Sequence, residues 1–167
     1  MSIGFAFAAL SDRGICGLYM LDDADPTPGL DRLRSDFPGA ELVEACEEVE
    51  PVLQRIAAFL DDGRDLDDLV LDLHGTPFQL RVWNALRSIG AGSTCTYGQI
   101  ARKLGLGSAA ARAVGAACGA NPVSLIVPCH RVVGSNGKLC GYRWGLARKR
   151  ALLERERKHA QQLIFAV

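Results

Sequence analysis

Charged side chains are divided unequally between the two halves of this 167-residue chain. Residues 1–73 contain 17 aspartates and glutamates and five arginines, a net charge of −12, whereas residues 74–167 contain 14 lysines and arginines and two glutamates, a net charge of +12. An asymmetry this large predicts an acidic lobe, 1–73, joined to a basic lobe, 74–167. A basic lobe suits a polyanion such as nucleic acid, although attraction between the lobes alone would also explain the division.

The rest of the composition excludes several classes of protein. No apolar run approaches the roughly 18 residues that a membrane-spanning helix needs, and the apolar stretch near the N-terminus lacks the basic flank of a signal peptide. The six cysteines include no CxxC pair, which argues against a disulfide framework and against a zinc site. We therefore expect a cytoplasmic protein with reduced thiols, no membrane partner, no metal and no other cofactor.

The acidic half has the pattern of a small α/β unit. Two apolar stretches, residues 3–10 and 14–21, flank a turn sequence and predict a β-hairpin. Apolar residues recur at three- and four-residue spacing in 30–37 and 49–60, which predicts two helices. The alternation in residues 69–73 predicts a further strand.

The basic half is expected to be mostly helical. Thr76 followed by Pro77 is typical of the start of a helix, and Thr96 and Ser108 are candidate caps for two others. Two of these helices are separated only by the glycine-containing turn 105–107, which is the sequence form of a helix-turn-helix. The predicted helices are residues 78–89, 97–104, 109–119 and 146–158.

Cys129 and His130 are the residues with the clearest chemical potential. A thiolate is a strong nucleophile, and an imidazole oriented by a carboxylate can help to deprotonate a thiol. The basic half offers two carboxylates for this purpose, Glu154 and Glu156. A Cys-His dipeptide alone is weak support, because a buried structural cysteine beside a histidine is a common arrangement.

The residues around Cys129 carry a longer signature. The segment 121–133, with the sequence NPVSLIVPCHRVV, closely resembles the active-site signature of the O6-alkylguanine-DNA alkyltransferases. The likeness covers essentially all of residues 72–157, and Arg13-Gly14-Ile15-Cys16 resembles the alkyltransferase part of bacterial Ada-type proteins. It includes residues 78–86, 96–100, 110–115, 141–145 and 149–156.

This resemblance implies a role for each of five residues. Cys129 would accept the alkyl group by in-line displacement, and His130, oriented by Glu156, would deprotonate the thiol through a bridging water. Tyr97 would donate a hydrogen bond to N3 of the guanine, and Asn121 would form the hinge between the helix-turn-helix and the active-site segment. The partner would be double-stranded DNA with O6-alkylguanine, or O4-alkylthymine, and the protein would act once, as a monomer.

The resemblance also implies how DNA and the base are held. A base must leave the duplex to reach a buried thiol, and Arg112 would fill the gap from a helix lying in the minor groove. The alternative for this alanine-rich helix is a core element, but an arginine is difficult to explain there. Main-chain groups of Cys129, Val132 and Arg143 would read the guanine, and Trp144 would narrow the pocket and favour methyl groups. Further substrate or DNA contacts are implied for Tyr142, Thr96 and Ser135.

The family likeness implies an α+β fold in which a small ribonuclease H-like N-terminal lobe packs on a mostly helical C-terminal lobe with a helix-turn-helix. Residues 2–4 resemble the start of the second strand of Ada-type relatives. Either the chain is a piece of a longer protein, or the small sheet of its acidic lobe lacks a first strand. This expectation concerns the N-terminal lobe and leaves the chemistry at Cys129 unaffected.

Three other functions compete with alkyl transfer. A non-catalytic protein that binds alkylated bases would lack the acceptor cysteine, which is present here. A helix-turn-helix regulator would offer Asn, Gln or Arg to base edges, whereas residues 109–117 are mainly alanine. A cysteine hydrolase would need an oxyanion hole, for which no motif is evident.

Overall fold

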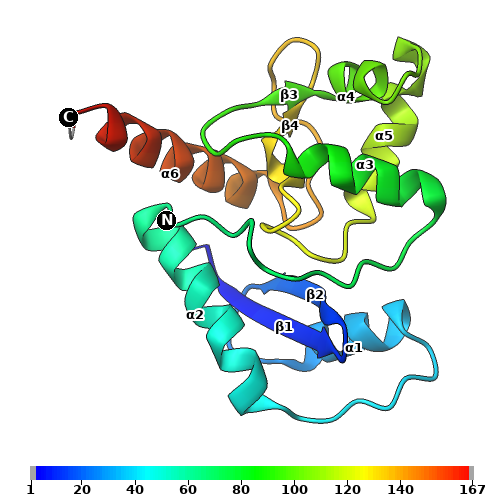
Figure 1. The fold of residues 1–167 in the computed structure, drawn as a ribbon, viewed down its shortest axis with the longest axis vertical. Coiled ribbons are helices and arrows are strands. Elements are labelled where there is room, and N and C mark those ends of the chain that lie inside the picture. The colour runs from blue at the N-terminus through cyan, green and yellow to red at the C-terminus, as the bar shows by residue number, and fades with distance from the viewer. Residues whose placement is uncertain (1–2, 166–167) are drawn as a thin grey trace.

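The computed structural model describes residues 3–165 of the chain, and its fold is α+β (Figure 1). Two strands and two helices from the first half lie together in the lower part of the view, and the remaining elements form the upper part (Figure 1). Within residues 3–165 no helix is both long enough and apolar enough to cross a membrane.

The N-terminal half is built on a β-hairpin. Strand β1 (Phe5–Ser11) pairs antiparallel with β2 (Gly14–Leu21), as the sequence predicts. Helix α1 (Thr27–Asp36) packs against β2, and α2 (Cys46–Asp62) packs against β1. Gly14 closes the turn with a φ of +145°, and a β-carbon there would lie 2.7 Å from the carbonyl oxygen of Val70, so a side chain would clash.

The strand predicted at residues 69–73 is not formed. Only Leu71 pairs with β2, opposite Ile15, through the hydrogen bonds Ile15 N to Val70 O (3.0 Å) and Asp72 N to Ile15 O (2.9 Å). Further along the same edge, β2 pairs with residues 122–124: Leu18 N donates to Pro122 O (2.9 Å), and Ser124 N donates to Leu18 O (3.1 Å). Residues 69–73 therefore have one partner residue on this edge.

The pairing of β2 with residues 122–124 joins the two halves just ahead of Cys129. Leu18 and Val123 face each other in this parallel bridge, and both are fully buried. The hairpin of the acidic half therefore supports the main chain that leads into Cys129.

The C-terminal half is mostly helical, as expected. Thr76 and Thr96 each cap a helix with a complete capping box, in which the threonine side chain accepts from Gln79 N or Gln99 N and the glutamine side chain accepts from the threonine N–H. The elements are α3 (Pro77–Arg87), β3 (Cys95–Thr96), α4 (Tyr97–Lys103), the 3-10 turn η1 (Ser108–Ala110), α5 (Ala111–Gly119), the 3-10 turn η2 (Cys129–Arg131), β4 (Val132–Val133) and α6 (Leu146–Phe165).

Helices α4 and α5 form the predicted helix-turn-helix, but its second helix begins differently from the prediction. Ser108 was expected to cap it, whereas the chain passes from the 3-10 turn η1 directly into α5 at Ala111 without a side-chain cap. The 3-10 turn already provides main-chain hydrogen bonds, such as Ala110 N to Gly107 O (3.0 Å), so the first turn does not depend on a serine hydroxyl.

One hydrophobic core runs through both halves. It includes Leu18 and Ile56 from the acidic half and Trp83, Ile100 and Leu152 from the basic half, all buried. The indole N–H of Trp83 donates to the carbonyl of Ala117 (2.8 Å) and fixes α3 against α5. The halves are therefore joined by a shared apolar core.

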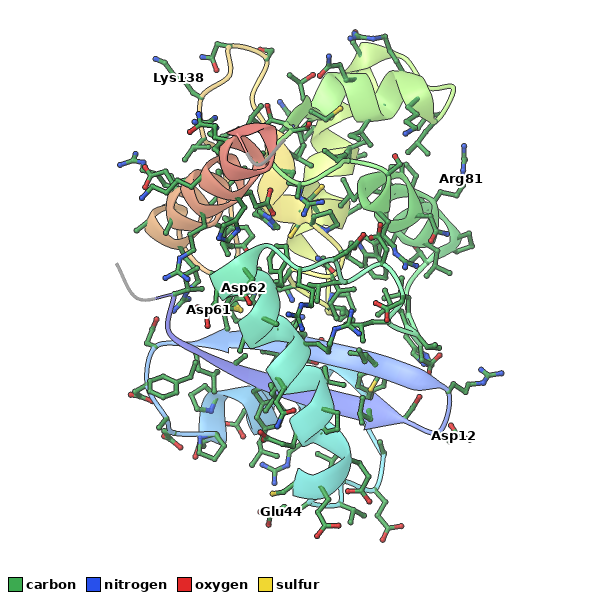
Figure 2. The ribbon with its side chains drawn as sticks, turned by 60° about the vertical axis from the view of Figure 1, so that its left-hand side comes forward. Asp12, Glu44, Asp61, Asp62, Arg81 and Lys138 are labelled. Atoms are coloured by element: carbon green, nitrogen blue, oxygen red, sulfur yellow. The ribbon has the colours of Figure 1, made fainter. Side chains whose placement is uncertain are left out.

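The charges of the two halves remain spatially separated after folding. Asp12 and Glu44 lie at one end of the molecule, and Lys138 lies at the opposite end (Figure 2). Arg148 of α6 reaches between the halves, where its guanidinium donates to the carbonyls of Ile3 (2.6 Å) and Leu21 (3.1 Å).

Candidate active site

Cys129 lies at the start of η2, with 6% of its surface exposed. The preceding segment makes a tight path, in which Leu125 has a φ of +70°, an uncommon conformation for a residue with a side chain. The N–H of Cys129 donates to the carbonyl of Val127 (2.8 Å). The thiol is thus presented from a rigid, buried turn.

Asn121 connects the end of α5 to this turn. Its side-chain amide donates to the carbonyl of Val127 (2.9 Å) and to the Cys129 sulfur (3.3 Å), and its carbonyl oxygen accepts from the N–H of Val123 (2.9 Å). Asn121 is itself buried. The structure therefore brings the Asn121 side chain and the Cys129 sulfur together.

His130 and Glu156 form a buried pair. Nε2 of His130 lies 2.7 Å from Oε1 of Glu156, and the two side chains are 0% and 3% exposed. Glu154, the other carboxylate of the basic half, is exposed on the same helix. The structure therefore pairs His130 with Glu156 and leaves Glu154 in solvent.

The charge states of this pair follow from its surroundings. Burial alone raises the pKa of Glu156, but hydrogen bonds and charges from His130 and Arg131 outweigh it and lower the pKa to about 2. Burial lowers the pKa of His130, and although Glu156 opposes this effect, the net direction is downward. Because a carboxylate can only accept, Nε2 of a neutral His130 carries the proton and Nδ1 keeps its lone pair.

Two polar atoms near the thiol have no hydrogen-bond partner within the described residues. They are Nδ1 of His130 and the hydroxyl of Tyr142, and both are buried. Burial raises the pKa of Tyr142 well above its ordinary value, and the nearby Cys129 adds to the effect. Nδ1 of His130 is therefore a buried basic nitrogen able to take up a proton.

Lys149 is a fully buried cation beside the thiol. Its ammonium donates to the carbonyls of Cys140 and Gly141 (both 3.1 Å) and lies 6.0 Å from the ring centroids of Tyr97 and Tyr142. Burial lowers the pKa of Lys149, and the nearby Cys129 opposes this shift. A cation at this position favours the thiolate over the thiol.

The pKa of Cys129 reflects two opposing influences. Burial raises it, whereas the hydrogen bond from Asn121 and the charges of Lys149 and Arg143 lower it, and the net direction is upward. The resting sulfur is therefore a thiol that needs a base at the moment of reaction. A buried thiol, a neutral imidazole and a fixed carboxylate together suit nucleophilic transfer to sulfur.

Tyr97 and Thr96 stand at the start of α4. The Tyr97 hydroxyl donates to the carbonyl of Cys140 (3.0 Å), and burial raises its pKa. The Thr96 side chain is engaged in capping α4. A hydrogen bond from Tyr97 to a bound base would therefore require the hydroxyl to leave Cys140.

Arg112 and Ser135 lie on the surface, away from the buried pair. Arg112 is exposed on α5 and forms no hydrogen bond or ion pair with any described residue. Ser135 is exposed in the loop 134–141. Val132 is fully buried in β4, and its N–H donates to the carbonyl of Cys129.

Arg143 and Trp144 turn toward the N-terminal half. The Arg143 guanidinium donates to the carbonyl of Asn121 (3.4 Å) and lies 6.0 Å from the centroid of the Trp144 ring. The Trp144 indole donates to the Ser124 hydroxyl and lies 6.1 Å from the ring of Tyr19. The position of Trp144 is therefore fixed by contacts with both halves.

The sequence interpretation missed Arg131 and Lys149. Lys149 lies seven residues before Glu156, two helical turns away on the same face of α6, and the buried Leu152 and Leu153 lie between them. The sequence pattern that could have revealed Lys149 is its position, with Glu156, within an apolar stripe of α6. Arg131 gave no such signal.

The chain is similar to known DNA repair enzymes and methyltransferases over most of its length. Residues 77–158 match the model of the 6-O-methylguanine DNA methyltransferase, DNA binding domain. The chain is 45% identical over 130 residues to the inducible methylated-DNA–protein-cysteine methyltransferase of Bacillus subtilis, covering 78% of this chain and 72% of that protein.

Two further relatives extend the match over nearly the whole chain. The Ada protein of Escherichia coli, a bifunctional transcriptional activator and DNA repair enzyme, is 41% identical over 96% of this chain, which spans only 44% of Ada. The crystal structure of Mycobacterium tuberculosis OGT in complex with DNA is 36% identical, with a TM-score of 0.74, and the match covers 94% of this chain and 89% of that one. The chain belongs to the family of methylated-DNA–protein-cysteine methyltransferases.

Proposed function

We propose that this protein repairs DNA by moving an alkyl group, mainly methyl, from O6 of guanine to Cys129. The observation that carries the proposal is the buried thiol of Cys129, held by Asn121 and followed directly by a His130–Glu156 pair. The names of the relatives, which include methylated-DNA–protein-cysteine methyltransferase, support the same reaction. O4-alkylthymine is proposed as a second substrate.

The reaction forms one bond and breaks one. The Cys129 sulfur bonds to the alkyl carbon while the bond from that carbon to O6 breaks, and the electron pair goes to the guanine. The thiol proton passes through a water molecule to Nδ1 of His130 and then to the departing base, while Tyr97 donates a hydrogen bond to N3. The guanine leaves neutral, and the stable thioether makes each molecule single-use.

Arg112 is proposed to hold the DNA open while the base is in the pocket. It projects from α5, whose other residues are mostly small, so the helix can approach a groove closely. Such a helix suits the minor groove, where a repair protein can bind without reading sequence. Thr96 and Ser135 are proposed to contact the DNA beside it, and Val132, Tyr142 and Arg143 to contact the base.

Trp144 is proposed to limit the size of the alkyl group. Its indole is held by Ser124 and packs near Tyr19, so this wall of the site resists displacement. Comparing reaction rates on DNA with O6-methylguanine and with O6-benzylguanine tests this role. We expect methyl to react much faster, and equal rates would refute the idea.

The main reaction is tested by intact mass. After incubation with a duplex that contains O6-methylguanine, we expect the protein to gain one methyl group, mapped to Cys129. Cys129→Ser should gain none, and the control Cys118→Ser, which changes another buried cysteine, should still gain one. An unchanged mass for the folded wild-type protein would refute the function.

The role of Arg112 is tested by comparing substrates. Arg112→Ala should slow transfer from duplex DNA more than transfer from the free base O6-methylguanine, because only the duplex needs to be held open. Arg102→Ala, at an exposed basic position on α4, serves as the matched control. Equal losses on both substrates would remove this role.

The remaining proposals concern the organisation of the chain. We infer that 1–73 is a small ribonuclease H-like lobe and that 74–167 is the DNA-binding and alkyl-transfer domain. We also propose that the protein is a cytoplasmic monomer. Sedimentation with and without DNA tests the monomer.

A further inference from the structure

The carboxylate of Glu156 is shared among three residues. Oε1 faces Nε2 of His130 (2.7 Å), and the same oxygen accepts from Nη2 of Arg131 (2.9 Å). Nε of Arg131 lies 3.1 Å from each of the two oxygens, and the N–H of Gly92 donates to Oε2 (3.0 Å). His130 therefore competes with a permanent cation for one carboxylate oxygen.

Arg131 is itself fixed in place. It is buried, and Nη1 donates to the carbonyl of Ile89, two residues after the end of α3. Asp65 and Asp67 line the same cavity as Arg131, of about 370 Å³, but within the described residues the only carboxylate paired with Arg131 is Glu156. The guanidinium is therefore committed to Glu156 on one side and to the main chain on the other.

Several charged or titratable groups act on the His130 ring. Glu156 of α6 favours its protonation, whereas Arg131 of η2 and Lys149 of α6 oppose it. Cys129 precedes it in η2, and the Tyr142 hydroxyl lies in the field of both Cys129 and Glu156. If Arg131 were removed, the whole charge of Glu156 would act on His130, and the imidazolium form would gain stability.

We propose that Arg131 is a positioning residue that orients the Glu156 carboxylate and keeps His130 neutral, with Nε2–H on Glu156 and Nδ1 open as the base. The proposal deepens the function proposed above and rests on it. During transfer the thiol proton moves to Nδ1 and the imidazolium then pairs with Glu156, while Arg131 keeps its charge throughout. Arg131 thereby sets the pH below which His130 stops acting as a base.

The test measures methyl transfer from an O6-methylguanine duplex as a function of pH. The wild-type rate falls at acidic pH as His130 becomes protonated, and in Arg131→Met we expect this fall to move up by about one pH unit. Arg131→Lys keeps the charge, so its fall should stay near the wild-type position, with a slower rate at neutral pH. Arg155→Met, beside Glu156 but bonded to the carbonyl of Leu60, should match the wild type.

A second measurement uses only the wild-type protein, so it remains possible if Arg131→Met fails to fold. The ¹⁵N shifts of the His130 ring in the wild-type protein report its charge and tautomer without any transfer. We expect a neutral ring protonated on Nε2 at pH 7, and a proton on Nδ1 or a charged ring there would overturn the proposal. Unshifted pH profiles in folded Arg131→Met would also overturn it, whereas a wild-type protein that takes no methyl group would refute the function itself.

Discussion

Lys149 is a buried positive charge close to the Cys129 thiol. Lys149→Met keeps the length of the side chain but removes the charge, so the pKa of Cys129 should rise and transfer at neutral pH should slow by roughly tenfold. The deficit should shrink as the pH is raised, because hydroxide then forms the thiolate. Stopped-flow rates across pH measure this, and Arg150→Met, at the exposed neighbour, should behave like the wild type. A deficit that stays constant with pH would contradict the electrostatic role.

Glu156 should make stability depend on pH in the acid range. Its pKa in the folded protein, about 2, is lower than the ordinary value of 4.5, so its contribution is complete above about 4.5 and is lost as the pH falls toward 2. Glu156→Gln should lower the free energy of unfolding at pH 7 by about 3 kcal/mol, with a difference that narrows below pH 4.5. Urea unfolding at several pH values measures it.

A control separates this effect from a general loss of charge on α6. Glu154→Gln removes a carboxylate from the same helix at an exposed position and should change stability little at any pH. If Glu156→Gln lowered the free energy of unfolding equally at pH 3 and at pH 7, the charge of the carboxylate would not be responsible for the loss.

Part of the candidate site could be inferred from the sequence and part could not. The Cys129-His130 pair was visible because it stands within a continuous motif, but the choice of Glu156 over Glu154 needed the family likeness. The structure supplies the physical reason, since only Glu156 lies on the buried face of α6. The partnership of Arg131 with that carboxylate depends on a helix 25 residues away, which no local pattern reveals.

The turn of the helix-turn-helix depends on one of its two glycines. Gly105 has a φ of +75°, whereas Gly107 has a φ of −69°, and an added β-carbon would meet no atom within 4 Å at either position. Gly105→Ala should therefore cost about 1 kcal/mol through backbone strain alone, while Gly107→Ala should be neutral or slightly stabilising. Thermal unfolding of the pair measures this, and equal effects would argue against strain.

The helices and the hairpin could be predicted from the sequence because interactions between nearby residues stabilise them. The hairpin and the helices followed from apolar spacing, and both threonine caps were confirmed because their partners lie three residues away. The prediction of a strand at residues 69–73 was wrong. Such a strand would need the free edge of β2, part of which pairs with residues 122–124. The local sequence of residues 69–73 does not show that residues 122–124 also pair with this edge of β2.

The two halves of the molecule are joined in part through Arg148. Its guanidinium donates to three main-chain carbonyls, those of Ile3, Leu21 and Trp144, and also contacts the exposed Asp22. Arg148→Met should lower the free energy of unfolding by roughly 2–3 kcal/mol, because it leaves these carbonyls unpaired. Asp22→Asn should cost less than about 0.5 kcal/mol, since that carboxylate is almost fully in solvent.

Denaturant unfolding of both variants distinguishes the carbonyl contacts from the ion pair. If Asp22→Asn were as destabilising as Arg148→Met, the ion pair would be the main contribution, and the halves would separate more readily in high salt.

The separation of charge along the molecule has a consequence for the way it meets DNA. With −12 gathered toward the end that carries Glu44 and +12 toward the end that carries Lys138, the protein is a strong electric dipole with no net charge (Figure 2). Near a polyanion the basic end is attracted and the acidic end is repelled, so a torque turns the basic end forward before contact. Collisions in the wrong orientation therefore become rarer, and because salt screens the distant acidic end, the basic end meets DNA with nearly its full positive charge.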